Sequence, residues 1–193
     1  MRKETKDVNK QTIINEAEKL FFYNGYKNTS LQQVAQRLNV TRPAIYHYFK
    51  SKEQIILAII DEVIEKTEKY FTELLLLEAP AYIKFEKMVE NHILLILENQ
   101  IKVGIFFEEQ KSLPEEVTMK TKEVIEQYYR TAAEWFHDGI KEGYFIDVSP
   151  SIAVQTILGS CNWAYKWYSP DGALSKCELS KLMSEILLKG YKK

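Results

Sequence analysis

Apolar residues recur along this chain with the period of an α-helix. In the first complete stripe, Leu31, Val34, Ala35 and Leu38 lie at i, i+3, i+4 and i+7 and would share one helix face. Longer stripes of the same period follow, and no stretch alternates apolar and polar residues in the way that predicts strands. The pattern therefore predicts an all-α fold.

Six helices are predicted after residue 50. The first opens at the capping box formed by Ser51 and Gln54 and continues as one long helix. Prolines and the turn at residues 169–172 mark boundaries between later helices. The expected ranges are 51–77, 85–97, 104–109, 114–143, 150–168 and 174–191.

Two short helices joined by a tight turn are predicted within residues 30–49. Ser30 with Gln33 forms a capping box that starts the first helix, and Asn39 tolerates the left-handed backbone that ends it. Thr41, followed within two residues by a proline, predicts the start of the second helix. In a helix-turn-helix of this kind the second helix enters the major groove of DNA.

The second of these helices has an inward and an outward face. Ile45 and Phe49 should anchor it, and the outward residues expected at the DNA are Thr41, Arg42, Ala44, Tyr46 and His47. Arg42 is the expected base reader, because a guanidinium pairs bidentately with guanine. Phosphate contacts are expected from Thr29, Thr41, Tyr46, His47 and Lys52.

With the upstream stripe Ile13-Ile14-x-x-Ala17-x-x-x-Phe21 and the pair Gly25-Tyr26, this segment strongly resembles the TetR family of one-component transcriptional regulators over about the first quarter of the chain. Two departures are small, since Asn39 and Pro43 stand where the family often has Gly. An ordinary helical pair is the alternative, but cap, turn, anchors and phosphate-facing groups all agree with DNA binding. The resemblance implies a three-helix headpiece and a six-helix effector-binding and dimerisation body.

Charge is sorted along the chain in agreement with a two-part organisation. Residues 1–52 hold ten Lys or Arg and four Asp or Glu, a net charge of +6; because the whole chain carries -1, the remainder carries -7. A basic headpiece attracts phosphates, whereas an acidic body stays off the DNA. We therefore expect a DNA-binding domain at 1–52, with its motif at 30–49, and a ligand-binding and dimerisation domain at 53–193.

The sequence also predicts a cytoplasmic protein with no membrane partner. It has no run of 18 apolar residues, and Met1–Asp7 lacks the apolar core of a signal peptide. Cys161 and Cys177 lie 16 residues apart without metal-binding spacing, so both are expected to be buried small hydrophobic residues.

We expect no enzyme activity, metal or cofactor. Of the three His, His47 belongs to the recognition helix, and His92 and His137 stand in no motif with a nucleophile. Glu134 and His137 have the Glu-x-x-His spacing of di-iron bundles, but that site needs a second copy and two more Glu. Turnover on a panel of thioesters would be needed to revive an enzyme hypothesis.

An amphipathic face is predicted where Asn162, Trp163, Lys166 and Trp167 combine apolar rings with an amide and a cation. Such a face suits a ligand that is part apolar and part anionic. Residues 159–172 are similar to the carboxyl-terminal Asn-Trp...Trp-Tyr-x-Pro-x-Gly pattern of TetR regulators that sense coenzyme A thioesters. This resemblance implies acyl-CoA as the small-molecule effector.

The acyl part of such an effector is expected beside Phe106 and Phe107. Two alternatives are compatible with the same residues. The tryptophans could pack a dimer interface with Lys166 solvated, or the chain could be a regulator of the same fold without any small ligand.

A homodimer is predicted from the last two helices. Small residues at Ala153, Ser160 and Ala164 permit close helix approach, and the accompanying apolar stripe comprises Leu179, Leu182, Met183, Ile186 and Leu187. This stripe could instead close the monomer core. A dimer would bind double-stranded DNA at a pseudo-palindromic operator, and effector binding would move the 51–77 helix to respace the two headpieces.

Overall fold

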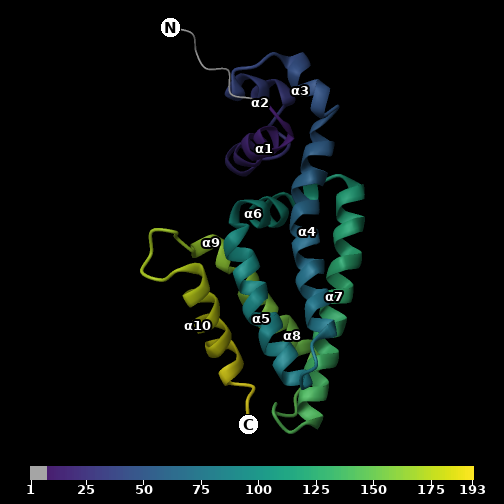
Figure 1. Cartoon of the computed structure of the whole chain (residues 1–193), viewed down its shortest axis with the longest axis vertical. Helices are drawn as coiled ribbons and strands as arrows, with labels where there is room; N and C mark the ends of the chain where they lie inside the picture. Colours follow the sequence, from purple (N-terminus) through teal and green to yellow (C-terminus); the bar gives the residue numbers. More distant parts are fainter. Residues whose placement is uncertain (1–7) are drawn as a thin grey trace. The chain divides into compact units, whose positions relative to one another are not determined.

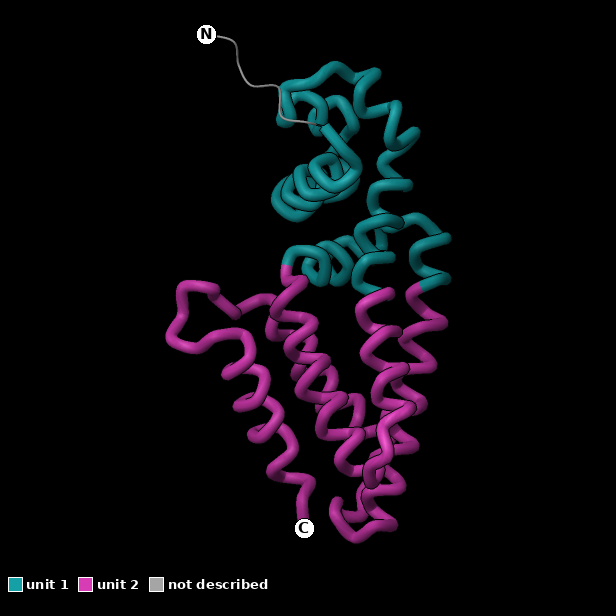
Figure 2. Tube along the Cα trace, viewed as in Figure 1, with its two compact units in different colours: residues 1–64, 101–120 teal, residues 65–100, 121–193 magenta. Residues whose placement is uncertain are grey.

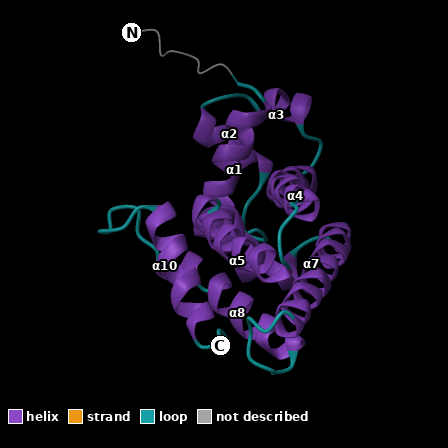
Figure 3. Ribbon diagram, turned by 60° about the horizontal axis from the view of Figure 1, so that its bottom comes forward, coloured by secondary structure: helices purple, strands orange, loops and turns teal. Residues whose placement is uncertain are grey.

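A computed structural model of the chain describes residues 8–193, and every regular element in this range is helical (Figures 1 and 3). The elements are α1 (Lys10–Asn24), α2 (Leu31–Leu38), α3 (Arg42–Tyr48), α4 (Lys52–Leu76), α5 (Ala81–Glu98), α6 (Gln100–Glu109), the 3-10 turn η1 (Gln110–Ser112), α7 (Glu115–Lys141), α8 (Pro150–Asn162), α9 (Ala164–Trp167) and α10 (Lys176–Lys189). The predicted all-α class is confirmed. The prediction about Met1–Asp7 concerns residues outside the described part.

The chain forms two compact units (Figure 2). Unit 1 contains the described residues up to Ile64 together with Ile101–Lys120, and unit 2 contains Glu65–Gln100 and Thr121–Lys193. Helices α4 and α7 each contribute residues to both units. These units are defined by packing, so the functional boundary between residues 52 and 53 stays a prediction.

Local sequence determines the helix-turn-helix in unit 1. Ser30 caps α2 by accepting from the Gln33 backbone N–H, and the Gln33 side chain returns a bond to the Ser30 backbone, so the predicted capping box is confirmed. Asn39 ends α2 in the left-handed conformation, with φ 57° and ψ 43°. Ile45 and Phe49 are buried as expected and hold α3 in place.

Aromatic packing organises the core of unit 2. Phe136 stacks on Phe145 with ring centroids 4.6 Å apart, and Phe85 meets both rings edge-on at 5.3 and 5.6 Å. A Cβ at Gly139 would lie 2.5 Å from the Phe145 ring, so this close approach requires glycine. Around the same core, α5 packs against α8, α9 and α10.

The predicted single helix over 150–168 is wrong. It divides at Trp163 into α8 and the four-residue α9. The Gln100 side chain donates to the carbonyl oxygens of Tyr165 and Tyr168 at 2.7 and 2.9 Å. These bonds satisfy carbonyl groups at the end of α9, although Gln100 is 65 and 68 positions away in the sequence. Such a partner is invisible to helical periodicity.

Two further expectations need correction. Cys161 is buried as predicted, but Cys177 is exposed, because it lies in the first turn of α10 on the side away from the core. The expected box at the start of α4 also differs, since Gln54 accepts a bond from the Lys50 backbone N–H at 2.7 Å, one residue before Ser51. No helix within residues 8–193 is long and apolar enough to cross a membrane.

Candidate DNA-binding surface and effector pocket

The exposed face of α3 carries most of the residues predicted to meet DNA. Thr41, Arg42 and His47 are exposed, and Ala44 and Tyr46 are partly exposed. Thr41 occupies the N-cap position of α3, but its hydroxyl makes no capping bond. That hydroxyl is therefore available to a phosphate at the start of the helix.

Arg42 is held in a defined orientation by Tyr46, one helical turn later. Its Nη2 donates to the Tyr46 hydroxyl at 2.8 Å, and its guanidinium carbon lies 5.0 Å from the centre of the Tyr46 ring. A guanidinium oriented before binding loses less side-chain entropy when it pairs with a base.

Lys52 lies in a different environment from the one predicted. Its Nζ donates to the carbonyl oxygens of Tyr26, Lys27 and Thr29 at 2.8, 3.2 and 3.1 Å, and it lies 4.5 Å from the centre of the Tyr26 ring. The Tyr26 hydroxyl in turn donates to Glu53 at 3.3 Å. The start of α4 thereby clamps the loop between α1 and α2, and Lys52 positions the headpiece from within.

Replacing Lys52 should test this clamp. Lys52→Met should lower the free energy of unfolding by about 1 to 2 kcal/mol, because three carbonyls lose a charged donor, and it should weaken binding to all duplexes alike. Denaturant unfolding and DNA titration at two salt concentrations measure both effects. Lys27→Met, an exposed change in the same loop, is the control. Unchanged stability with a salt slope reduced by about one unit would instead indicate a phosphate contact.

Thr29 is the other predicted contact that lies inside the headpiece. It is buried, and its hydroxyl is within hydrogen-bond distance of the carbonyl oxygens of Leu20 and Gly25, at 3.2 and 3.0 Å. We therefore leave Thr29 out of the DNA-facing surface. Sequence reasoning missed Lys50, which is exposed and whose Nζ donates to the Tyr46 carbonyl at 2.7 Å; a basic residue directly after the Phe49 anchor was the available signal.

A buried ionic cluster joins three helices of unit 1. Lys102 on α6 lies 3.3 Å from a carboxylate oxygen of Glu18 on α1 and also pairs with Glu62 on α4. The side chains of Lys102 and Glu18 are only 13 and 12% exposed. Because removing one partner of a buried pair is costly, this cluster fixes α1 against α4 and α6.

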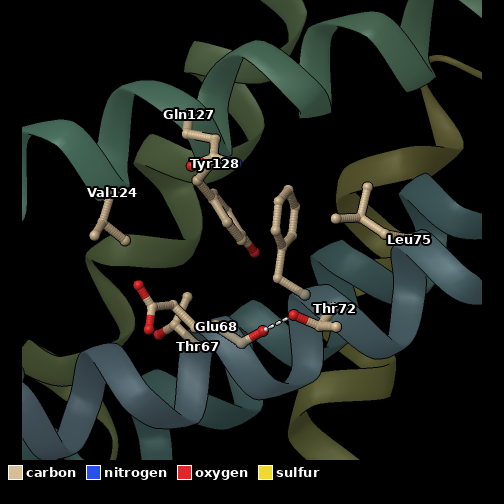
Figure 4. Close-up of a pocket in the computed structure, with 8 residues that line it drawn as sticks. Thr67, Glu68, Thr72, Leu75, Val124, Gln127 and Tyr128 are labelled. Carbon is tan, nitrogen blue, oxygen red and sulfur yellow. Dashed lines mark hydrogen bonds between the residues drawn. The ribbon is translucent and has the colours of Figure 1, made fainter.

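Unit 2 contains a pocket of about 300 Å³ between α4 and α7 (Figure 4). Its lining comprises Thr67, Glu68, Phe71, Thr72, Leu75, Val124, Gln127 and Tyr128. The size is at the lower end of the range for small-molecule sites, and the lining combines the apolar Phe71, Leu75 and Val124 with hydroxyl, amide and carboxylate groups. This pocket is the candidate effector site.

A polar pair lies next to the pocket. His92 Nε2 is 2.8 Å from Asn162 Oδ1, and the His92 ring packs on Tyr128 with centroids 5.5 Å apart. Burial lowers the pKa of His92, so the imidazole is neutral at pH 7 and donates its Nε2 hydrogen to the amide oxygen. Sequence reasoning selected Asn162 but missed His92, which is 70 positions away.

The remaining predicted effector residues divide between the two units. Phe106 and Phe107 belong to unit 1, whereas the others belong to unit 2. Trp163 and Trp167 are 60 and 51% exposed, and the Lys166 Nζ lies 5.8 Å from the centre of the Trp163 ring. Within unit 1 the Phe106 and Phe107 rings pack edge-on with centroids 5.4 Å apart. The ligand role of all six predicted residues stays a prediction.

Several large apolar side chains are exposed on the elements from α8 to α10 in unit 2. They are Ile152, Trp163, Trp167, Leu182 and Ile186. Ser180, Ser184 and Leu188 point inward instead, so the outer part of the predicted α10 stripe does not close the monomer core. Large exposed apolar patches of this kind mark interaction sites.

Comparison with known proteins identifies both parts of the chain. Residues 13–59 match the model of bacterial regulatory proteins of the tetR family, and residues 78–191 match the tetracyclin repressor-like C-terminal domain. A crystal structure of a TetR/AcrR-family transcriptional regulator from Thermobifida fusca is 30% identical, with a TM-score of 0.72, and the match covers 95% of this chain and 98% of that one.

Two further relatives have more informative names. The fatty acid metabolism regulator protein of Bacillus subtilis is 24% identical over 92% of this chain and 93% of its own length. AibR, crystallised with isovaleryl coenzyme A and operator DNA, is 24% identical with a TM-score of 0.78, over 92% of this chain and 96% of its own. The latter likeness shows the shared fold.

Proposed function

Because the chain belongs to the TetR family of bacterial regulatory proteins, we propose that it is a homodimeric repressor that a small molecule releases from its operator. The main support is that the headpiece matches the tetR family model. In addition, α3 exposes Arg42, whose guanidinium is oriented by its hydrogen bond to the Tyr46 hydroxyl. Such a protein acts by binding, so we assign it no catalytic role and place it in the cytoplasm with the DNA.

DNA recognition would divide between base and phosphate contacts. With α3 in the major groove, Arg42 would pair with O6 and N7 of a guanine, while Thr41 and His47 would bind phosphates and fix the register. Two-fold symmetry would place a second α3 about 34 to 36 Å away, or a multiple of that distance, on a pseudo-palindromic operator.

The effector that we propose is a coenzyme A thioester. Support comes from the relatives named for fatty acid metabolism or crystallised with isovaleryl coenzyme A, and from the small pocket whose Tyr128 ring packs on His92, the partner of Asn162. The anionic part of coenzyme A would need a cation outside the pocket, a role for which Lys166 is the candidate.

Helix α4 is suited to carry the response. Its residues Thr67 to Leu75 line the pocket, and its first residue, Lys52, clamps the headpiece loop. A ligand that binds better to one position of α4 would shift the population toward that position and change the spacing of the two headpieces. Operator affinity would then fall as the ligand binds.

Operator release tests this proposal. We expect acyl-coenzyme A species to dissociate the protein from a DNA duplex that it selects from a random pool, as measured by fluorescence anisotropy. Free coenzyme A should have no effect. Lys166→Glu should bind the duplex like the wild type but respond more weakly, because an anion would replace the cation near the phosphates. Indifference of the wild type to butyryl-, octanoyl- and palmitoyl-coenzyme A would refute the thioester assignment.

A further inference from the structure

One polar group in the α4–α7 pocket has no partner. Tyr128 is only 8% exposed, yet no hydrogen bond joins its hydroxyl to any residue of the described range 8–193. Figure 4 shows this hydroxyl directed from α7 into the space in front of α4. A hydroxyl that faces a pocket without a protein acceptor can donate a hydrogen bond to a ligand that supplies one.

The direction of this hydroxyl is fixed by ring packing. The Tyr128 ring packs against the Phe71 ring, with centroids 5.3 Å apart, and against the His92 ring, with centroids 5.5 Å apart. Asn162 in turn holds His92. Burial also raises the pKa of Tyr128, so the hydroxyl keeps its hydrogen and acts as a donor at physiological pH.

The charge of the lining selects against an anion. Glu68 is the only charged residue among the eight that line the pocket, and no Lys, Arg or His belongs to that set. The remaining surface is formed largely by Phe71, Leu75 and Val124, together with hydroxyl and amide groups. Lys84 lies at the edge of this set, where its Nζ donates to the Leu75 carbonyl oxygen at 3.4 Å, but it is not among the lining residues. The lining itself therefore offers a free carboxylate no cation and one like charge, the exposed Glu68, which disfavours the anion.

We propose that this pocket takes the hydrocarbon part of an uncharged acyl group, a thioester or ester, and that Tyr128 donates its hydroxyl hydrogen to the acyl carbonyl oxygen. The proposal deepens the effector assignment above and rests on it for its biological meaning. A pocket with a hydroxyl donor and no cation in its lining would distinguish an activated acyl group from the free acid. At about 30 Å³ for each water-sized volume, 300 Å³ holds roughly ten heavy atoms, the size of an octanoyl group.

Removing only the hydroxyl tests the assigned contact. Tyr128→Phe should raise the concentration of octanoyl-coenzyme A needed for half-maximal operator release by about three- to tenfold, the range expected for one lost hydrogen bond. Tyr70→Phe is the matched control, because the Tyr70 hydroxyl already donates to the Lys87 carbonyl at 3.0 Å, and this variant should respond like the wild type. Equal responses of wild type and Tyr128→Phe would overturn the proposal.

Direct binding separates this proposal from the repressor assignment. Calorimetry with methyl octanoate, a neutral ester without coenzyme A, should show binding to the wild type and weaker binding to Tyr128→Phe. Octanoate should bind poorly to the wild type. Glu68→Gln should raise the affinity for octanoate, because it removes the negative charge from the lining. Glu73→Gln, on the same helix but outside the pocket, is the control and should leave that affinity unchanged. If the ester bound in a Tyr128-dependent way but thioesters did not release the operator, the assigned Tyr128 contact would stand and the thioester would not be the effector. Absence of ester binding to the wild type would overturn the pocket chemistry itself.

Discussion

Leu182→Glu should convert the protein from a dimer to a monomer at micromolar concentration. Leu182 and Ile186 are 43 and 63% exposed, and they lie one helical turn apart on α10. If a second copy covers this face, each dimer would bury two unpaired carboxylates at the seam. An uncompensated buried charge costs about 3 to 5 kcal/mol, which corresponds to at least a hundredfold rise in the dimer dissociation constant.

Analytical ultracentrifugation measures this change directly. The matched control is Leu76→Glu, the same substitution at a more exposed leucine in the last turn of α4, which should remain dimeric. A monomeric Leu182→Glu should also lose most of its operator affinity, because one headpiece would contact only one half-site. A dimeric Leu182→Glu would reject the exposed side of α10 as the interface.

Arg42→Ala should have the largest effect on sequence recognition. Loss of a bidentate guanine contact should cost about 1 to 3 kcal/mol in binding and relax the preference at one base position of each half-site. Competition titrations with the operator and its single-base variants measure both quantities. Tyr46→Phe should have a smaller effect in the same direction, because it removes only the hydroxyl that orients Arg42.

Arg37→Ala provides the control for charge. Arg37 is a headpiece arginine on α2 that pairs with Glu16 at 2.9 Å, so its loss should leave base preference unchanged. If Arg42→Ala and Arg37→Ala changed affinity equally and neither altered base preference, α3 would not be the reading helix.

Local signals made the headpiece predictable from sequence. The Ser30 cap, the left-handed Asn39 and the anchors Ile45 and Phe49 each depend on neighbours within a few residues, and all four behave as expected. The partners of Lys52 could not be predicted, because they lie 23 to 26 positions away in a loop whose path depends on tertiary packing.

The effector region was less predictable for the same reason. The division of α8 and α9 depends on Gln100, and the partner of Asn162 is His92; neither contact leaves a periodic signal. Helical spacing alone placed Trp163, Lys166 and Trp167 on one ligand face, whereas the structure exposes all three. Periodicity identifies which residues share a face but not what covers that face.

Selection from random duplex DNA would show whether the purified protein is a dimeric, sequence-specific DNA-binding protein. Sequencing of the bound pool should show a two-fold symmetric site whose half-site centres are separated by about 10 base pairs or a multiple of that spacing. The same selection with Arg42→Ala should lose one conserved position in each half-site. A pool without enrichment, or an enriched site without two-fold symmetry, would contradict the account of a dimeric, sequence-specific regulator.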